Sequence, residues 1–297
     1  MPCAASSATI KGVRLRLEIG LLAIIAVLRA PAVRADVDSE HMFGFTEGTD
    51  IGTPFQAEGE IEMVGRAGRT AGSYSAVSAT ASLKYPLSQS FRLAPSITFT
   101  RFDISGVPDF ENRNAIAFER LALEFRWRPF DRETSLFGLT FVATPFVGFV
   151  DAVTGAPGDS WGGNFIAAVD RALIPDRLFA ALNLSYGLGR TRDYASGLII
   201  DGSGLGLNAA ATARVLDWLY LGGEVRYLRA FDGLAFDNLA GQALYLGPTF
   251  YIALGQGASL SGAWNIQAWG QTTGLDAGLD LVLFERQMFK LRLAIDL

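Results

Sequence analysis

Cysteine and histidine are almost absent from this chain. One residue of each type occurs among 297, whereas zinc clusters, haem ligation, disulfide frameworks and His-based catalysis all draw on these two residues. The charge is acidic rather than basic, with 25 Lys and Arg against 30 Asp and Glu, and a protein that neutralises nucleic-acid phosphates needs a basic face. The sequence therefore predicts no cofactor, no metal site and no nucleic-acid partner, and it argues against most classes of enzyme.

Long apolar runs are also missing beyond the N-terminal region. The longest uncharged apolar stretch there, residues 136–150, is interrupted by Thr140, Thr144, Pro145 and Gly148, whereas a membrane helix needs about 20 predominantly apolar residues. Yet hydrophobic residues make up 50% of the chain, charged residues only 19%, and glycine numbers 33. This composition is too apolar for a disordered chain and too rich in glycine for a helical bundle.

The first 35 residues are typical of an export signal. Lys11, Arg14 and Arg16 form a positively charged start, residues 19–28 form an apolar stretch, and Ala35 ends a small-residue cleavage motif. We expect cleavage after Ala35, which leaves residues 36–56 as an N-terminal leader and residues 57–297 as the main domain. The exported chain then has 20 basic and 29 acidic residues, a net charge of −9, and loses its one cysteine, Cys3.

Apolar residues recur at every second position, the spacing that places side chains alternately on the two faces of a β-strand. In residues 77–85 the odd positions are Val, Ala, Ala, Leu and Tyr, whereas the even positions are Ser, Thr, Ser and Lys. About thirteen such segments lie between Ala57 and Leu297. Clear examples are residues 91–100, 121–128, 178–188, 205–215, 259–268 and 289–297.

The composition of the two faces distinguishes a membrane barrel from a soluble β-sandwich, whose outward face would be rich in Lys, Glu and Thr. Here one face is mostly Leu, Phe, Val and Ala, as suits lipid, and the other is mostly Gly, Ala, Ser, Thr and Asn, as suits a crowded or water-filled lumen. A closed barrel also leaves no unpaired strand edge in a bilayer. The sequence predicts an all-β fold, a transmembrane antiparallel β-barrel of about 12–14 strands. Girdle aromatics are expected near strand ends at Tyr85, Trp127, Trp218 and Trp269.

The connections between these segments alternate between two lengths, and bacterial barrels place short turns in the periplasm and longer loops outside the cell. Short turns are expected at 86–90, 129–134, 174–176, 216–218, 255–257 and 285–287. Longer loops, which we assign to the cell exterior, are expected at 65–73, 105–113, 152–162, 192–203 and 232–242.

The number of strands stays open at this point, because thirteen is odd and single-chain bacterial barrels have an even number. An extra strand at 42–47, within the leader, would make fourteen and reverse the sidedness. If the first segment did not form a strand, because Glu58, Glu60 and Glu62 weaken its apolar pattern, the barrel would have twelve strands.

The segments 40–52, 65–69 and 72–74, together with the turn at 284–286 and the last strand, resemble a poorly characterised family of proteobacterial outer-membrane β-barrels. These are similar to the transporter-like barrels encoded with phenol-degradation (MetA-type) pathways. The resemblance implies an exported barrel in the cell outer membrane and the passage of small molecules, and it brings no catalytic residues.

Catalytic chemistry has little support. Barrel enzymes place a His beside Ser or Asp, because the nucleophile or water must be deprotonated near neutral pH. The one candidate, His41, lies in the leader beside Glu40, and we interpret this region as a solvated, disordered leader. The sequence predicts no catalytic residue.

Charges on the predicted inner face are the best functional candidates. Either they line a water-filled route and select what passes, or they pair across a narrow lumen and plug it. The first segment contributes Glu58, Glu60 and Glu62. The other expected lumen-lining charges are Arg120, Glu124, Arg126, Arg128, Arg214, Glu224, Arg226, Lys290 and Arg292.

These observations predict an outer-membrane barrel that is a narrow passive channel or transporter for small solutes. The alternative is a closed structural or surface barrel without transport, and a barrel enzyme has the least support. The expected partners are outer-membrane lipid, the barrel-assembly machinery and a small solute that the sequence does not identify.

Overall fold

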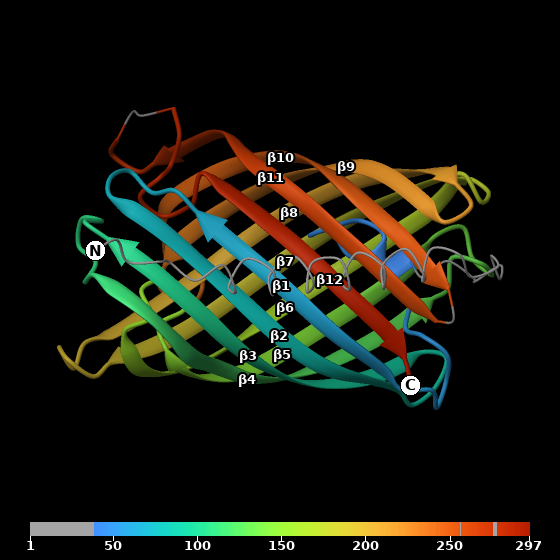
Figure 1. Ribbon diagram of the computed structural model, residues 1–297, viewed down its shortest axis with the longest axis horizontal. Coiled ribbons are helices and arrows are strands. Elements are labelled where there is room, and N and C mark those ends of the chain that lie inside the picture. The colour runs from blue at the N-terminus through green and yellow to red at the C-terminus, as the bar shows by residue number, and fades with distance from the viewer. Residues whose placement is uncertain (1–38, 256, 276–277) are drawn as a thin grey trace, which may run out of the picture.

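The computed structural model describes residues 39–255, 257–275 and 278–297, in which twelve strands close into one antiparallel barrel (Figure 1). The predicted signal peptide and its cleavage after Ala35 lie outside these residues. A short 3-10 turn, η1 (Ser39–His41), comes first. The strands are β1 (Glu58–Ala67), β2 (Ser73–Pro86), β3 (Phe91–Ser105), β4 (Arg113–Phe130), β5 (Gly138–Val150), β6 (Pro157–Ile174), β7 (Leu178–Asp193), β8 (Ile199–Leu216), β9 (Leu219–Asp232), β10 (Asn238–Gly255), β11 (Ala258–Thr272) and β12 (Gln287–Asp296).

Every strand pairs with its neighbours in sequence, and the pairing of β1 with β12 closes the ring. Glu60 of β1, for example, lies opposite Ala294 of β12 on one side and Ser82 of β2 on the other. Closure satisfies the backbone hydrogen bonds of all strands and leaves no open sheet edge. This confirms the predicted fold class. In the part of the chain that the structure describes, no helix has the length and apolar character needed to cross a membrane.

The barrel has twelve strands, which lies within the expected range of 12–14. Neither of the two changes considered for the N-terminal region takes place. Residues 42–47 are turns inside the barrel and not an extra strand. The segment containing Glu58, Glu60 and Glu62 forms β1, because its glutamates face inward and find cationic partners there. The short turn expected at 285–287 is also wrong, since it is the end of a long connection, 273–286, between β11 and β12.

The two ends of the barrel differ in their connections. β1 begins and β12 ends at the end that carries the connections after β2, β4, β6, β8 and β10, which we name the short-turn end. Four of these five connections have two to four residues, and the one after β4 has seven. The connections at the opposite end, the loop end, have five residues or more. The C-terminal strand therefore ends at the short-turn end, whereas an odd number of strands beginning at that end would finish at the loop end.

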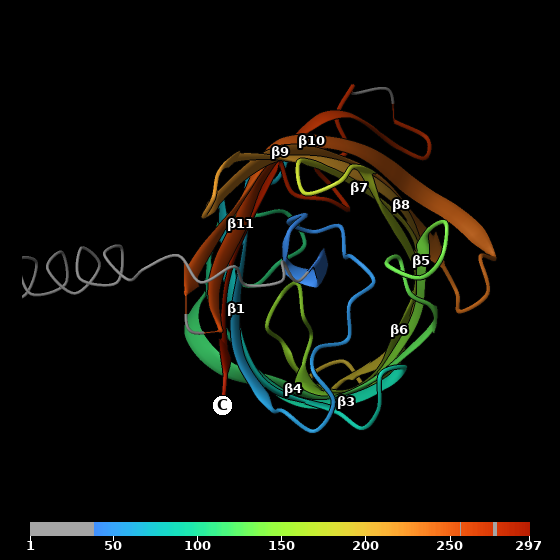
Figure 2. The ribbon, with the colours of Figure 1, turned by 90° about the vertical axis from the view of Figure 1, so that its right-hand side faces the viewer.

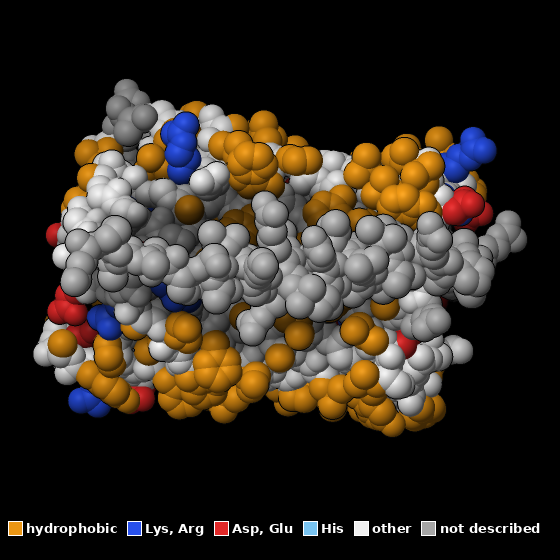
Figure 3. Space-filling view, viewed as in Figure 1, with side chains coloured by type: hydrophobic (Ala, Val, Ile, Leu, Met, Phe, Trp, Pro, Cys, Tyr) orange, Lys and Arg blue, Asp and Glu red, His pale blue; other side chains and the backbone are white. Residues whose placement is uncertain are grey.

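The outer surface is apolar around the middle of the barrel. Leu182 on β7 is 49% exposed, whereas its neighbour Asn183 points inward and is 1% exposed. Where Figure 3 shows described residues, hydrophobic side chains form large patches along the barrel, and most charged ones lie toward its two ends. The four expected girdle aromatics are all exposed. Tyr85, Trp127 and Trp218 lie near the short-turn end and Trp269 near the loop end.

Candidate functional site: a plugged lumen

The N-terminal segment lies inside the barrel rather than in solvent. Looking into the short-turn end, Figure 2 shows this segment, in blue, within the ring of strands. Residues 39–52, here named the plug, are mostly buried, and His41, Met42, Phe43 and Thr46 are at most 1% exposed. The expectation of a solvated, disordered leader is therefore wrong for these residues. Hydrogen bonds and apolar contacts between the plug and the inner wall account for this burial.

The plug is a compact loop whose two ends are tied together. The Ser39 amide donates to the Asp50 carboxylate at 2.7 Å, and the Thr49 amide donates to the Ser39 hydroxyl at 3.3 Å. Gly48 lies at this crossing, where any Cβ would overlap the Ser39 carbonyl. Gly44 has φ +74°, and a Cβ there would lie 2.7 Å from the Ala263 Cβ on the wall. Glycine is thus required where the loop closes and where it meets β11.

Among the described plug residues, Glu40 forms ion pairs with the largest number of cations. Its carboxylate accepts hydrogen bonds from Arg92 at 2.5 and 2.8 Å and from Lys84 at 3.1 Å, and it lies 3.3 Å from Arg126. Burial by itself raises the pKa of the Glu40 carboxyl, but the three cations outweigh burial and hold that pKa well below its usual range. Glu40 is therefore ionised at neutral pH and fixes the plug to β2, β3 and β4.

Two inward carboxylates of the wall bind the plug backbone. Glu224 on β9 accepts from the amides of Phe45 and Thr46 at 3.0 and 2.9 Å and from the Thr46 hydroxyl at 3.0 Å. On β6, Asp170 accepts from the Thr49 hydroxyl at 2.6 Å and from its amide at 3.1 Å. Charge-assisted hydrogen bonds of this kind are stronger than neutral ones, so these carboxylates position the loop as well as balance charge.

The opposite side of the plug is apolar and aromatic. Met42 and Phe43 pack into a buried cluster with Phe179, Tyr220 and Tyr251 of β7, β9 and β10. The Phe45 ring lies under two cations, 4.1 Å from the Arg226 guanidinium carbon and 5.1 Å from the Lys290 ammonium. Cation–π contacts of desolvated groups are worth about 2 kcal/mol, so the Phe45 ring contributes to plug binding alongside the hydrogen bond from its amide to Glu224.

The structure brings most of the predicted inner charges together around the plug. Arg126, Arg128, Glu224, Arg226, Lys290 and Arg292 all contact it. Glu124 is linked to the plug through Arg92, which it contacts at 2.6 Å and which also binds Glu40. Two others lie apart from it. Arg120 pairs with the buried Glu119 farther along β4, and Arg214 pairs with the exposed Asp217 at the short-turn rim.

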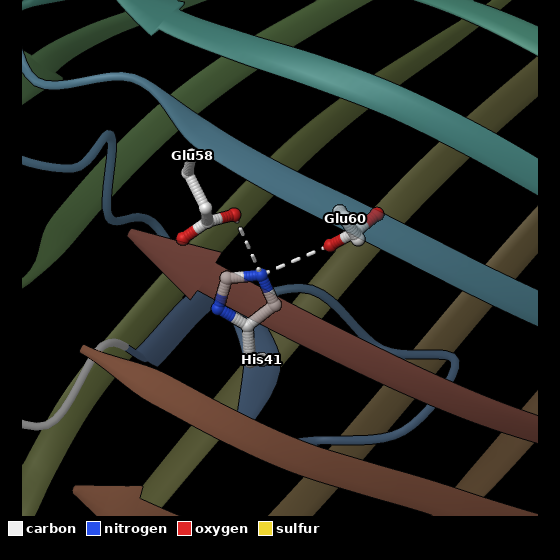
Figure 4. A group of neighbouring side chains, drawn as sticks. All are labelled: His41, Glu58 and Glu60. Carbon is white, nitrogen blue, oxygen red and sulfur yellow. Dashed lines mark hydrogen bonds and ion pairs between the residues drawn. The ribbon is translucent and has the colours of Figure 1, made fainter. Parts of the chain in front are cut away.

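The segment 58–62 and the plug share one cluster that resembles a metal site. His41 Nε2 lies 3.4 Å from Glu58 and 3.0 Å from Glu60 (Figure 4). The three side chains could hold a metal ion by spacing. However, the Lys84 ammonium lies 2.9 Å from the same nitrogen and 3.1 and 2.7 Å from the same two carboxylates. Lys84 therefore supplies the positive charge that an ion would otherwise bring.

Between the plug and the loop end the lumen contains a cavity of about 520 Å³. Glu40, Glu47, Lys84 and Arg292 form part of its lining on the plug side. Its side walls are mixed: Thr80, Ser82, Ser96, Thr144, Asn164 and Ser185 are polar, whereas Ile166, Leu205, Leu228 and Phe284 are apolar. The cavity is large enough for a small organic solute. Below it, the plug occupies the route to the short-turn end.

Sequence reasoning did not single out several residues that hold the plug. Lys84, Arg92 and Asn183 lie at alternating inward positions, but nothing in the sequence distinguishes them from other polar inward residues. Asn183 exchanges two hydrogen bonds with the backbone of Glu47, at 2.6 and 2.8 Å. The sequence feature that could have indicated a folded plug lies in the leader itself, where Ser, Glu, Thr and Asp are interspersed with glycines at 44, 48 and 52.

Comparison with known proteins assigns the chain to a family. A model of DUF6662, a family of unknown function, matches residues 35–297. The chain belongs to this family. No curated protein matches this DUF6662 member.

Solved structures show the same kind of barrel. The COG4313 outer membrane channel from Pseudomonas putida F1 is similar to the DUF6662 chain with a TM-score of 0.58 at 11% identity, over 84% of this chain and 98% of that one. The NanC porin has a TM-score of 0.46 at 8% identity, over 80% and 100%. The translocator domain of the autotransporter NalP from Neisseria meningitidis has a TM-score of 0.46 at 12% identity, over 98% and 99%. The similarity to the COG4313 channel supports the fold of this DUF6662 member. At 11% identity it supports nothing beyond the fold.

Proposed function

We propose that this protein is an outer-membrane channel for small solutes whose route is closed by its own N-terminal plug. The observation that carries the proposal is the cavity of about 520 Å³ above a plug held by ion pairs and hydrogen bonds. A structural barrel has no need of a solute-sized cavity, and a plug whose described contacts with the wall are ion pairs, hydrogen bonds and apolar packing can leave the lumen while it stays joined to β1. The apolar outer belt supports a location in outer-membrane lipid, reached through the barrel-assembly machinery.

The likeness to a named outer membrane channel and the resemblance to MetA-type barrels agree with this proposal. We further propose that the barrel is not an enzyme. His41 is bound by Glu58, Glu60 and Lys84, an arrangement that holds a plug in place and in which the imidazole faces no hydroxyl nucleophile among these neighbours.

Single-channel current in a planar bilayer tests the function. The refolded protein should conduct rarely, and a variant with Glu40→Gln and Glu47→Gln should conduct more often, because both carboxylates anchor the plug. Heat-modifiable migration and a β-rich circular dichroism spectrum verify that the variant is folded. A folded variant that never conducts would overturn the channel in favour of a closed structural barrel.

A further inference from the structure

Five cations form a row on the inner barrel wall beside the plug. Lys84 on β2, Arg92 on β3, Arg126 and Arg128 on β4, and Arg132 in the turn after β4 form this row, which we name the basic track. Each pairs with a plug carboxylate. Lys84, Arg92 and Arg126 pair with Glu40, Arg126 pairs also with Glu47, and Arg128 and Arg132 pair with Asp50 at 3.3 and 2.7 Å.

The partners of Arg126 set it apart from the rest of the track. Lys84 has Glu58 and Glu60, Arg92 has Glu124, Arg128 has Asp131 and Arg132 has Asp170, all on the barrel itself. Within the described residues, the ion pairs of Arg126 go to Glu40 and Glu47, both in the plug. Its side chain is 0% exposed. A charge that loses its ion-pair partners is less stable, so of the five cations Arg126 has the most to gain from another anion when the plug leaves.

The two plug carboxylates that bind Arg126 are within reach of a solute, although Arg126 itself is not among the residues that line the cavity. Glu40 and Glu47 line the cavity above the plug, beside Lys84 and Arg292. A solute that fills this cavity therefore meets Glu40 and Glu47 together with Lys84 and Arg292, and it reaches Arg126 once the plug carboxylates move aside. Glu60, Glu62 and Glu124 also line it, but Arg292 pairs with Glu60 and Glu62, and Arg92 pairs with Glu124. The carboxylates of the wall keep their partners without the plug, whereas Arg126 does not.

We infer that the basic track is a binding site for small organic anions, centred on Arg126, and that the carboxylates of Glu40 and Glu47 occupy the positions of the solute carboxylates while the plug is docked. An organic anion and the plug then compete for one site, and binding of the anion opens the route. This inference rests on the proposed channel and adds the class of its solute. Arginine suits the role because its guanidinium binds carboxylates with two parallel hydrogen bonds.

The test is the accessibility of the plug in the full-length barrel. A Met42→Cys variant in a Cys3→Ser background carries its single thiol at a site that is 0% exposed, and Cys is a small apolar substitute there. Labelling by a water-soluble maleimide is followed with succinate, with its uncharged amide succinamide, or with 1,4-diaminobutane, all at constant ionic strength. Succinate should raise the labelling rate roughly tenfold, a usual size for coupling between two binding events, and the other two compounds should not.

Two further variants identify the site. Arg126→Gln should label quickly without any added compound and lose its response to succinate. Arg214→Gln, whose ion pair with Asp217 lies at the rim, should respond as the parent does. Equal responses to succinate and succinamide, or a succinate response that survives Arg126→Gln, would overturn the anion site.

Conductance of the same Met42→Cys protein separates the two claims. Currents that increase with succinate support both. A protein that conducts but does not respond to succinate refutes the anion site and leaves the channel standing. A thiol that responds to succinate in a barrel that never conducts supports the site and refutes the channel.

Discussion

Arg126 on β4 and Glu47 in the plug form an ion pair of 3.0 Å between residues 79 positions apart, and the same guanidinium donates to the Gly48 carbonyl at 2.5 Å. This pair joins the barrel wall to the segment that fills it. Its partners come from regions of the chain with no local relationship, so the pair forms only when the barrel closes around the plug.

Arg126→Ala should weaken plug binding by about 3–5 kcal/mol, because it leaves two plug carboxylates with fewer cationic partners in a buried site. The expected results are frequent single-channel openings and a lower midpoint temperature of the heat-modifiable band. The control is Arg190→Ala. Arg190 pairs with Asp201, but it is 42% exposed, and such a pair is worth about 1 kcal/mol or less. If both variants behave alike, the plug is not held by this pair.

Gly48→Ala should open the plug loop, because the new Cβ would overlap the Ser39 carbonyl where the loop crosses itself. Overpacking of this kind costs about 1–3 kcal/mol. The expected outcome is an increase in single-channel openings with an unchanged β-rich spectrum. Gly59→Ala is the matched control, since its Cβ would meet Leu297 at 3.6 Å, an ordinary contact, and should leave the currents as they are.

Acid should release the plug, and the sign follows from Glu40. Because the cations around Glu40 lower its pKa from the ordinary value of 4.5, the docked state is stabilised at pH values above 4.5, and that stabilisation is lost as the pH falls through the lowered pKa. Openings should therefore stay rare from neutral pH down to 4.5 and increase below it. Glu40→Gln should open often at neutral pH and show a smaller change on acidification. Openings that increase as the pH rises would contradict this sign.

Leu207→Arg should destabilise the barrel by about 2–4 kcal/mol, the cost of Arg on the lipid face near the bilayer midplane. Leu207 lies midway along β8 and is 47% exposed on the outer surface. Leu198→Arg, in the loop before β8 and 63% exposed, should cost at most about 1 kcal/mol because it lies at the interface. Urea unfolding in lipid vesicles measures both costs. Equal costs would place the bilayer elsewhere on the barrel.

Lys84→Ala should create a zinc site. Removal of the ammonium leaves His41, Glu58 and Glu60 with ligand atoms all within 4.8 Å of one another, and one imidazole with carboxylates suits Zn²⁺. Calorimetric titration should show zinc binding by the variant and none by the parent. Adding His41→Ala should abolish it. Zinc binding by the parent itself would show that Lys84 does not substitute for an ion.

The sequence by itself determined the barrel and the direction of its side chains. The period-two alternation in β2, β7 and β8 predicts which residues face outward, because the pleat of a strand leaves no choice once one face must meet lipid. It therefore predicts the outward Leu182 and the inward Asn183 from their spacing alone. Only the tertiary structure decided the strand count and the role of the leader. The ends of strands depend on which partner continues the ladder, and β1, with three glutamates in its first five residues, is stable because Lys84, Lys290 and Arg292 face it across the strands on either side. The plug has no period of its own. Its conformation is set by contacts with Arg92, Arg126, Asp170, Asn183 and Glu224, which come together only when distant strands close into a ring.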